Sequence, residues 1–464
     1  MGEVISRSQE RPVVAERGER RRRLLSVAVC AAVAVAFADS SIVVLALPSL
    51  YASLRTSIVG VSWVITSYNL VVAVGAFLLL AVIRRLRVAR LTQGGLALFA
   101  VGSAGCAASG TLVTLIVFRC VQGAGAAMLL AGTLPLLAAL RGSRPQGVAL
   151  WVAAGTLGAA LGPALGGLLT QLFSWRAIFV LQAPVALVAL VAAFESHLQP
   201  SAEHRRRIYV AANVGLGLVF GALVGALFLA VLMVISVWGL SPLAGAATVS
   251  ALPLAAVLVR SVSGGLSGWS TAGAGATLLA GGLVALALLP ATSIPIVVVA
   301  LALCGAGMGL VVPILTHAAV PGDEGLVSEG TMSIGARHAG LVVALVLVAP
   351  LLSHDLDRGG QDALLSGAKV LLSADLPLRQ QVPIALDLGR TLDRTPRGTV
   401  PDLAKPFDAR GAAHDPRLAA TRDSLVGAIK DALTRSFRRA LALCAGLAAL
   451  SLVAIALARR RRPA

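Results

Sequence analysis

The chain consists of long apolar runs separated by short polar segments. A helix that crosses the ~30 Å apolar core of a bilayer needs about 20 residues, so runs of this length predict membrane-spanning helices and not the short strands of a β-barrel. The sequence is therefore predicted to be an all-α polytopic membrane protein. The twelve predicted spans are residues 24–49, 58–83, 88–109, 111–140, 147–172, 177–196, 208–236, 240–262, 270–290, 294–319, 326–353 and 436–458.

The composition supports a membrane protein. The 464 residues are 57% hydrophobic and 13% charged, whereas soluble domains carry roughly 25% charged residues. The formal net charge is +18, and a strongly basic chain suggests nucleic-acid binding. Here, however, the arginines lie in short segments between apolar runs, which is typical of membrane topology. We therefore expect a lipid bilayer around the chain and no nucleic-acid partner.

The arginines also indicate an orientation. Counted from a cytoplasmic N-terminus, the inner segments are basic, whereas the short outer loops carry only Arg55 and Arg176. This asymmetry predicts that both termini are cytoplasmic. The scarcity of lysine beside abundant alanine and glycine is typical of a GC-rich bacterial genome, so the predicted location is the bacterial plasma membrane.

The even number of spans and a basic segment near the middle predict two six-helix bundles. One long segment, residues 354–435, interrupts the second bundle before the last helix and is predicted to lie outside the cell. Its apolar spacing favours a small helical cap over the outer mouth, and a flexible connector is the alternative. The predicted parts are an inner tail (1–23), an N-terminal bundle (24–196), an inner linker (197–207), a C-terminal bundle (208–458) and a second tail (459–464).

Two charged residues fall at membrane depth, where a charge costs several kcal/mol and usually marks a pathway or an ion pair. Asp39 lies ~22 Å along the first span and Arg119 ~12 Å from the outer end of the fourth, at 1.5 Å per residue. Because these spans run in opposite directions, both residues fall at similar depth. Burial and a nearby arginine act in opposite directions on an aspartate's proton affinity. Both residues are therefore proton-coupling candidates, with a structural ion pair as the alternative.

The eleventh span carries a second polar pair near its midpoint, Arg337 and His338. A histidine titrates near physiological pH, so His338 is a further proton-coupling candidate, with a structural hydrogen bond as the alternative. Arg337, Asn69 and Gln122 are candidate lining residues of a substrate cavity.

The sequence offers no catalytic constellation. The five cysteines lie within apolar spans without metal-ligand spacing, and the Gly-Lys loop that binds nucleotide phosphates is absent. We therefore expect no enzymatic activity, no metal and no cofactor. Energy for any transport would come from an ion gradient or from a partner.

A glycine-rich stretch lies inside the fifth span. Its glycines are spaced so that one narrow helix face carries them, and a proline within the stretch bends the helix. In lipid such a face allows two helices to approach closely. It predicts either a hinge between helices or an ordinary tight contact. The residues are Gly155, Gly158, Gly162, Pro163, Gly166 and Gly167.

Several stretches resemble the major facilitator superfamily, particularly its drug/proton antiporter branch. Residues 38–48 (ADSSIVVLALP) with residues 63–68 (WVITSY) resemble that branch's signature over the first two spans. Residues 118–127 (FRCVQGAGAA) resemble the fourth-span motif, whose arginine is implicated in proton coupling and is Arg119 here. Residues 162–167 (GPALGG) resemble the fifth-span motif associated with exporters. In the second half, residues 335–340 (GARHAG) match more loosely.

The resemblance implies a monomeric, proton-coupled exporter of small hydrophobic or amphipathic compounds that works by alternating access. Export of a lipid or lipid-linked metabolite is an alternative. One loop departs from the family pattern, because it lacks the usual acidic residue and glycine, and this departure keeps open a transport-incompetent sensor or scaffold. The basic residues of that loop are Arg84, Arg85, Arg87 and Arg90.

Overall fold

The computed structural model describes residues 2–82, 85–195, 209–262, 268–321, 326–374, 376–394, 405–410, 412 and 415–461. The regular elements in these ranges are all helices. Twelve of the described helices are long and apolar enough to cross a membrane, which confirms the predicted number of spans. The predicted linker, residues 197–207, lies outside the described residues.

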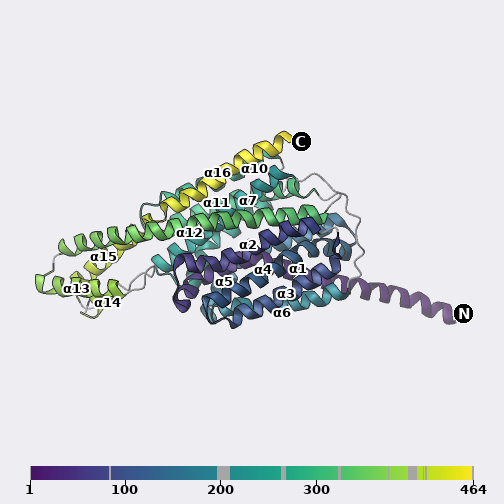
Figure 1. Cartoon of the computed structure of the whole chain (residues 1–464), viewed down its shortest axis with the longest axis horizontal. Coiled ribbons are helices and arrows are strands. Elements are labelled where there is room, and N and C mark those ends of the chain that lie inside the picture. Colours follow the sequence, from purple (N-terminus) through teal and green to yellow (C-terminus); the bar gives the residue numbers. More distant parts are fainter. Residues whose placement is uncertain are drawn as a thin grey trace.

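The spans form two six-helix bundles that pack side by side (Figure 1). The first bundle contains α1 (Gly2–Leu54), α2 (Ile58–Val82), α3 (Val88–Ala108), α4 (Leu112–Arg141), α5 (Arg144–Leu172) and α6 (Arg176–Glu195). The second contains α7 (Val210–Val231) with η2 (Leu232–Val237), α8 (Pro242–Val249) with α9 (Ala251–Val262), α10 (Trp269–Ala287), α11 (Ile294–Ala319), α12 (Leu326–Leu372) and α16 (Arg438–Arg461).

Both chain termini lie at the same end of the bundles, on the right of Figure 1. We call this the terminal end, because it carries Arg23 and Arg459. The other end, from which α12 projects, is called the insertion end. The outward faces of the bundles expose large apolar side chains such as Leu78, Leu161 and Val299. A bilayer would cover such faces, since lipid tails are as apolar as the side chains.

Local sequence signals explain several helix ends. Thr111 and Thr114 form a capping box at the start of α4, and Gly142 closes that helix with a positive φ of 65°. The eighth span is divided into α8 and α9 at Ser250. Pro253 has no N–H to offer Val249, the residue four positions before it, so the helical hydrogen-bond ladder is interrupted there.

The glycines of α5 pack against α1. A Cβ atom at Gly158 would overlap the backbone oxygen of Ala34, and one at Gly166 would overlap that of Ile42. At Gly155 the ring of Phe37 lies 2.7 Å from where the Cβ would stand. Ser41 of α1 donates a 3.3 Å hydrogen bond to the Ala159 carbonyl. The glycine face therefore joins two helices of the same bundle.

Gly167 is the exception, because it faces the other bundle. A Cβ atom there would overlap the side chain of Ala246 and lie 2.9 Å from the Pro242 carbonyl oxygen, both in α8. This contact lies at the insertion end, where α5 ends and α8 begins. It brings the backbones of the two bundles close together at that end.

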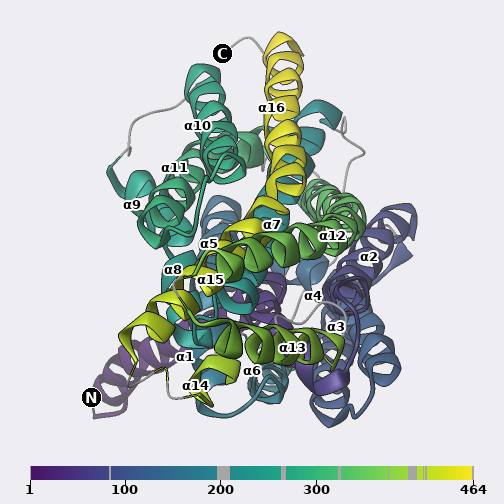
Figure 2. The ribbon, with the colours of Figure 1, turned by 90° about the vertical axis from the view of Figure 1, so that its left-hand side faces the viewer.

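The segment at 354–435 is helical over most of its described residues. Helix α12 continues without interruption to Leu372, so its 47 residues span ~70 Å, well beyond a ~30 Å bilayer core. It is followed by α13 (Leu378–Arg394), α14 (Lys405–Asp408) and α15 (Pro416–Arg435), and α15 leads into α16. The chain of helices projects beyond the other spans in Figure 1, and Figure 2 views the molecule from this end.

This insertion has a small apolar core of its own. Ile384 and Phe407 are fully buried in it, together with residues of α12 and α15. Polar contacts tie its base to the second bundle, because Lys430 donates to the Trp238 carbonyl at 2.7 Å and Trp238 donates to Thr434 at 2.9 Å. The described part of the insertion is therefore a folded extension.

Truncation of one side chain in this core tests that conclusion. Ile384→Ala removes a fully buried side chain, whereas Leu386→Ala changes a residue of the same helix that is 59% exposed. Loss of a buried isoleucine costs about 2–5 kcal/mol. We expect Ile384→Ala to speed protease cleavage within the insertion by roughly tenfold or more, and Leu386→Ala to behave as the wild type. Equal cleavage of the two variants would show that the core does not hold the insertion together.

Candidate functional site

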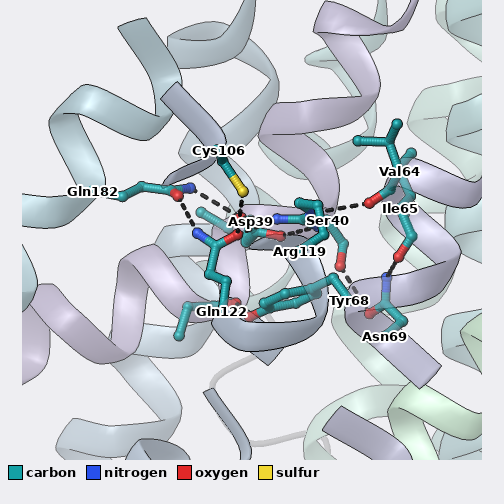
Figure 3. Close-up of polar contacts among 12 residues, drawn as sticks. Asp39, Ser40, Val64, Ile65, Tyr68, Asn69, Cys106, Arg119, Gln122 and Gln182 are labelled. Atoms are coloured by element: carbon teal, nitrogen blue, oxygen red, sulfur yellow. Dashed lines mark hydrogen bonds and ion pairs between the residues drawn. The ribbon is translucent and has the colours of Figure 1, made fainter. Parts of the chain in front are cut away.

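The interior of the first bundle holds a completely buried ion pair. Arg119 of α4 donates a 2.8 Å hydrogen bond from Nη1 to Oδ1 of Asp39 on α1, and its Nη2 lies 2.6 Å from Asp39 Oδ2 in an ion-pair contact. Both side chains are 0% exposed. The two residues predicted to lie at similar depth are thus in direct contact (Figure 3). A charge-assisted hydrogen bond with a second close contact between the charged groups fixes the orientation of both side chains as well as their charge balance.

Neighbouring side chains and one backbone carbonyl engage further donors and acceptors of this pair. Arg119 Nε donates to the Val64 carbonyl of α2 at 2.8 Å, and Arg119 Nη1 donates to Gln122 Oε1 at 2.6 Å. Gln182 of α6 donates to Asp39 Oδ1 at 3.0 Å and accepts a 2.7 Å bond from Gln122 Nε2. The same Gln122 nitrogen donates to Ser103 of α3 at 2.8 Å. One connected network therefore joins five of the six helices of the first bundle.

Aromatic rings enclose the guanidinium group. The Arg119 Cζ atom lies 4.3 Å from the centre of the Tyr68 ring and 5.7 Å from that of Phe179. A cation over a ring face is attracted to the π-electrons, and the attraction is larger where water is excluded. Tyr68 is held in turn by a 3.0 Å hydrogen bond to the Ala36 carbonyl of α1.

A second polar link crosses from the first bundle to the second. Ser40, the residue after Asp39, donates to Asn69 Oδ1 at 3.0 Å, and the same oxygen lies 2.6 Å from His338 Nδ1 of α12. Asn69 is oriented by a 2.8 Å bond to the Ile65 carbonyl. The rings of His338 and Tyr68 form a T-shaped pair, with their centres 6.3 Å apart. His338 therefore contacts both Asn69 and the aromatic residue that covers Arg119.

A mostly apolar cavity of about 1270 Å³, including its part open to solvent, lies between the bundles. It reaches from Arg260, exposed in the last turn of α9 at the terminal end, to Ser41 and Pro163, which lie 13 and 9 residues before the insertion-end termini of α1 and α5. At the insertion end the bundles are in contact through Gly167 and α8. We conclude that the cavity opens at the terminal end. Its lining includes Phe37, Ser40, Trp151, Phe220, Thr316, Arg337 and His338.

The structure separates the predicted site residues into two groups. Asp39, Arg119 and Gln122 lie in the buried network, whereas Arg337 and His338 line the cavity, and Asn69 connects the two groups through Ser40 and His338. Gln122 is therefore placed in the interior of the first bundle and not among the lining residues of the cavity.

The other predicted elements lie away from the buried network. Gly155 and Pro163 line the cavity, Gly158, Gly162 and Gly166 pack against α1, and Gly167 packs against α8. Arg85 and Arg87 in the loop between α2 and α3, and Arg90 in the first turn of α3, are exposed at the terminal end. Arg84 lies outside the described residues.

Sequence reasoning missed Gln182 and Ser103. Gln182 is the single polar residue between the charged ends of α6, whereas α3 carries Thr92 and Gln93 besides Ser103. Gln182 and Ser103 are both at most 2% exposed. A buried amide in an apolar helix needs a partner, because lipid offers no hydrogen bonds. The isolated polar residue was therefore the available signal, but the sequence does not show which partner it finds.

These features define a class of protein: a twelve-helix membrane transporter fold with a cavity between two bundles. The family model of the Major Facilitator Superfamily matches residues 29–320. The chain belongs to this superfamily, whose members are transporters rather than enzymes.

Two similar proteins carry names that refer to antibiotics. The Tetracenomycin C resistance and export protein of Streptomyces glaucescens is 35% identical over 183 residues, which are 39% of this chain and 34% of that protein. The Methylenomycin A resistance protein of Bacillus subtilis is 35% identical over 159 residues, 34% of each chain. This chain thus matches about a third of the length of these curated relatives.

Solved structures show the same fold at low identity. A bacterial homolog of the human lysosomal transporter Spinster, in an inward-facing and occupied conformation, has a TM-score of 0.62 and 14% identity, with 96% of this chain and 99% of that chain covered. A D-xylose-proton symporter has a TM-score of 0.56 and 14% identity, with 69% and 88% covered.

A larger side chain at position 167 tests whether the contact of Gly167 with α8 holds the insertion end closed. Gly167→Val places a branched side chain where Ala246 and the Pro242 carbonyl stand. We expect the spin–spin distance between labels at Thr170→Cys and Leu243→Cys, in a cysteine-free background, to lengthen or broaden. Gly281→Val is the control, because nothing lies within 4 Å of a Cβ atom at that position. An unchanged distance in Gly167→Val would contradict this role.

Proposed function

We propose that this protein is a proton-coupled secondary transporter that exports small hydrophobic or amphipathic compounds across the bacterial plasma membrane by alternating access. The single observation that carries the proposal is the cavity between the bundles, connected through Ser40 to the buried Asp39–Arg119 pair. The proposed partners are a small-molecule substrate and the bilayer, and the proposed functional unit is a monomer. The proposed energy source is the proton gradient, with no cofactor.

Alternating access requires that the cavity open at one end at a time. The cavity opens at the terminal end, where the arginine-rich segments predict the cytoplasm. The Gly167–Ala246 contact lies at the opposite end. In the proposed cycle the bundles rock about the cavity, so that this contact separates while the terminal end closes. Substrate then enters from the cytoplasm and leaves on the outside.

The buried ion pair supplies a reason for coupling. Protonation of Asp39 would neutralise its carboxylate and leave the Arg119 guanidinium as a buried cation without a balancing charge. An unbalanced buried charge is strongly unfavourable, so proton binding favours a rearrangement around Arg119. Ser40 and Ser41 follow Asp39 directly on α1 and line the cavity. Movement of this segment of α1 would therefore change the part of the cavity wall that a bound substrate contacts.

The direction of transport is proposed from likeness. The names of two relatives contain "resistance", and one contains "export". The fifth-span stretch at residues 162–167 resembles the motif associated with exporters. In the structure this stretch includes Gly167 at the insertion end and Pro163 at the cavity, so it contacts both places that must change in the proposed cycle.

One observation favours a lipid or lipid-linked metabolite as a second candidate substrate. The insertion exposes Leu364, Leu365 and Leu372 by 48%, 71% and 78% on the part of α12 that projects past the bundle. Apolar side chains at this position would offer a released lipid a surface to contact. Transport assays should therefore include a fluorescent lipid beside soluble dyes.

Neutralisation of Asp39 tests the coupling. In proteoliposomes with an imposed pH gradient, we expect Asp39→Asn to lose gradient-driven transport of every dye or lipid that the wild type moves, because asparagine cannot take up a proton. Asp387→Asn is the control, since it removes an acid in the insertion. The pKa of Asp387 is held below its usual value mainly by a hydrogen bond from Arg410, so this acid is ionised near neutral pH.

Two outcomes would count against the proposal. Gradient-driven transport at the wild-type rate in folded Asp39→Asn would remove Asp39 from the coupling mechanism. Binding of compounds by the wild type without any movement across the vesicle membrane would favour the sensor or scaffold suggested by the departing loop.

A further inference from the structure

The charges that line the cavity are all of one sign. Arg260 and Arg337 are the charged lining residues, and His338 is the titratable one. No aspartate or glutamate lines the cavity within the described part of the chain. An apolar cavity with only positive charges disfavours an organic cation and attracts an anion.

Arg337 differs from the other buried arginine, Arg119. Arg119 makes an ion pair with Asp39, whereas no carboxylate lies within 4 Å of Arg337 among the described residues. Arg337 is 8% exposed, and its Nη2 donates a 2.8 Å hydrogen bond to Thr316. Its Nε is buried and has no hydrogen-bond acceptor among the described residues. A guanidinium carries five N–H donors, so most of its capacity remains available.

The surroundings of Arg337 orient the side chain without balancing its charge. Its Cζ lies 5.0 Å from the centre of the Phe220 ring on α7, and its hydroxyl partner Thr316 is on α11. The facing residues of α1 and α5 include Ser41 and Thr156, which are uncharged. On α12 the preceding acid is Glu329, eight residues and ~12 Å away along the helix, and it does not line the cavity.

Arg260 extends the positive character to the mouth. It is exposed in the last turn of α9, while Arg337 lies eleven residues into α12, ~16 Å from the start of that helix. An anion that enters at the terminal end therefore meets one cation at the mouth and a second, desolvated cation in the interior. Electrostatic attraction of this kind raises the rate of entry for an oppositely charged ligand.

We propose that the substrate is an amphipathic organic anion, with its oxyanion bound by Arg337 and its apolar body in the cavity. This inference rests on the proposed function and names its substrate class. A planar guanidinium presents parallel N–H groups that match a carboxylate, sulfonate or phenolate oxygen. The apolar body lies against Phe37, Trp151 and Leu223, which are lining residues from both bundles.

Three probes with the same apolar ring test the proposal: naphthoate, naphthamide and naphthylmethylammonium. Binding is measured by calorimetry on the full chain in phosphatidylcholine nanodiscs, with empty nanodiscs subtracted and no gradient present. We expect naphthoate to bind the wild type about tenfold or more tightly than naphthamide, because charge-assisted hydrogen bonds are the stronger ones. The ammonium probe should bind most weakly.

Variants assign this preference to Arg337. Arg337→Gln should lower naphthoate affinity about tenfold or more and leave naphthamide affinity nearly unchanged. Arg337→Lys should keep part of the preference, since lysine retains the charge without the planar donor pair. Arg176→Gln is the control. That residue contacts the Ser109 carbonyl and the Trp175 ring at the insertion end and does not line the cavity.

Several outcomes would overturn the inference. These are naphthamide or the ammonium probe binding as tightly as naphthoate, an undiminished preference in folded Arg337→Gln, or no naphthoate binding at its solubility limit. The wild-type ranking decides the matter even if a variant fails to fold. Because binding is measured without a gradient, its failure is distinct from loss of pH-driven transport, which would instead contradict the proposed coupling.

Discussion

The Asp39–Arg119 pair is the interaction on which the first bundle depends. Burying two charges in the apolar core is costly, and the cost is offset only when geometry is good and the remaining polar atoms are satisfied. Here the pair makes one hydrogen bond and a second close ion-pair contact, and Val64, Gln122 and Gln182 satisfy further donors and acceptors. These partners come from different helices. The charge pair therefore imposes a mutual position on helices that lipid alone would not hold in register.

The two bundles differ in whether a buried arginine has a counter-ion. The first bundle encloses an arginine with its counter-ion, whereas α12 of the second presents Arg337 to the cavity without a carboxylate partner among the described residues. A balanced pair favours a fixed interior, and an unbalanced cation favours a ligand that completes it. His338 lies next to Arg337 in sequence and contacts Asn69 of the first bundle. The unbalanced site and the balanced pair are thus connected through two side chains and Ser40.

Sequence alone predicted the twelve spans, because a run of about twenty apolar residues has few possible structures other than a membrane-spanning helix. It also placed Asp39 and Arg119 at one depth, since helix rise converts position into distance. Depth does not specify rotation about the helix axis, so their contact and the roles of Gln182 and Gln122 required the structure. The same limit applied to the glycines. Spacing placed them on one face, but only the structure shows that Gly158 meets α1 while Gly167 meets α8. The extension of α12 beyond residue 353 was likewise missed, because polar residues can continue a helix outside the bilayer.

Helix α5 is the element that links these features physically. Its glycines bring its backbone against α1, the helix that carries Asp39, so the two helices move together or separate at high cost. Its cavity face includes Gly155, Thr156 and Pro163, and its last turns contact α8. A shift of α1 at Asp39 is therefore transmitted to α5, and through α5 to the cavity wall and to the contact at the insertion end. The close α1–α5 packing is what allows a change at the buried Asp39 to reach both the cavity wall and the contact at the insertion end.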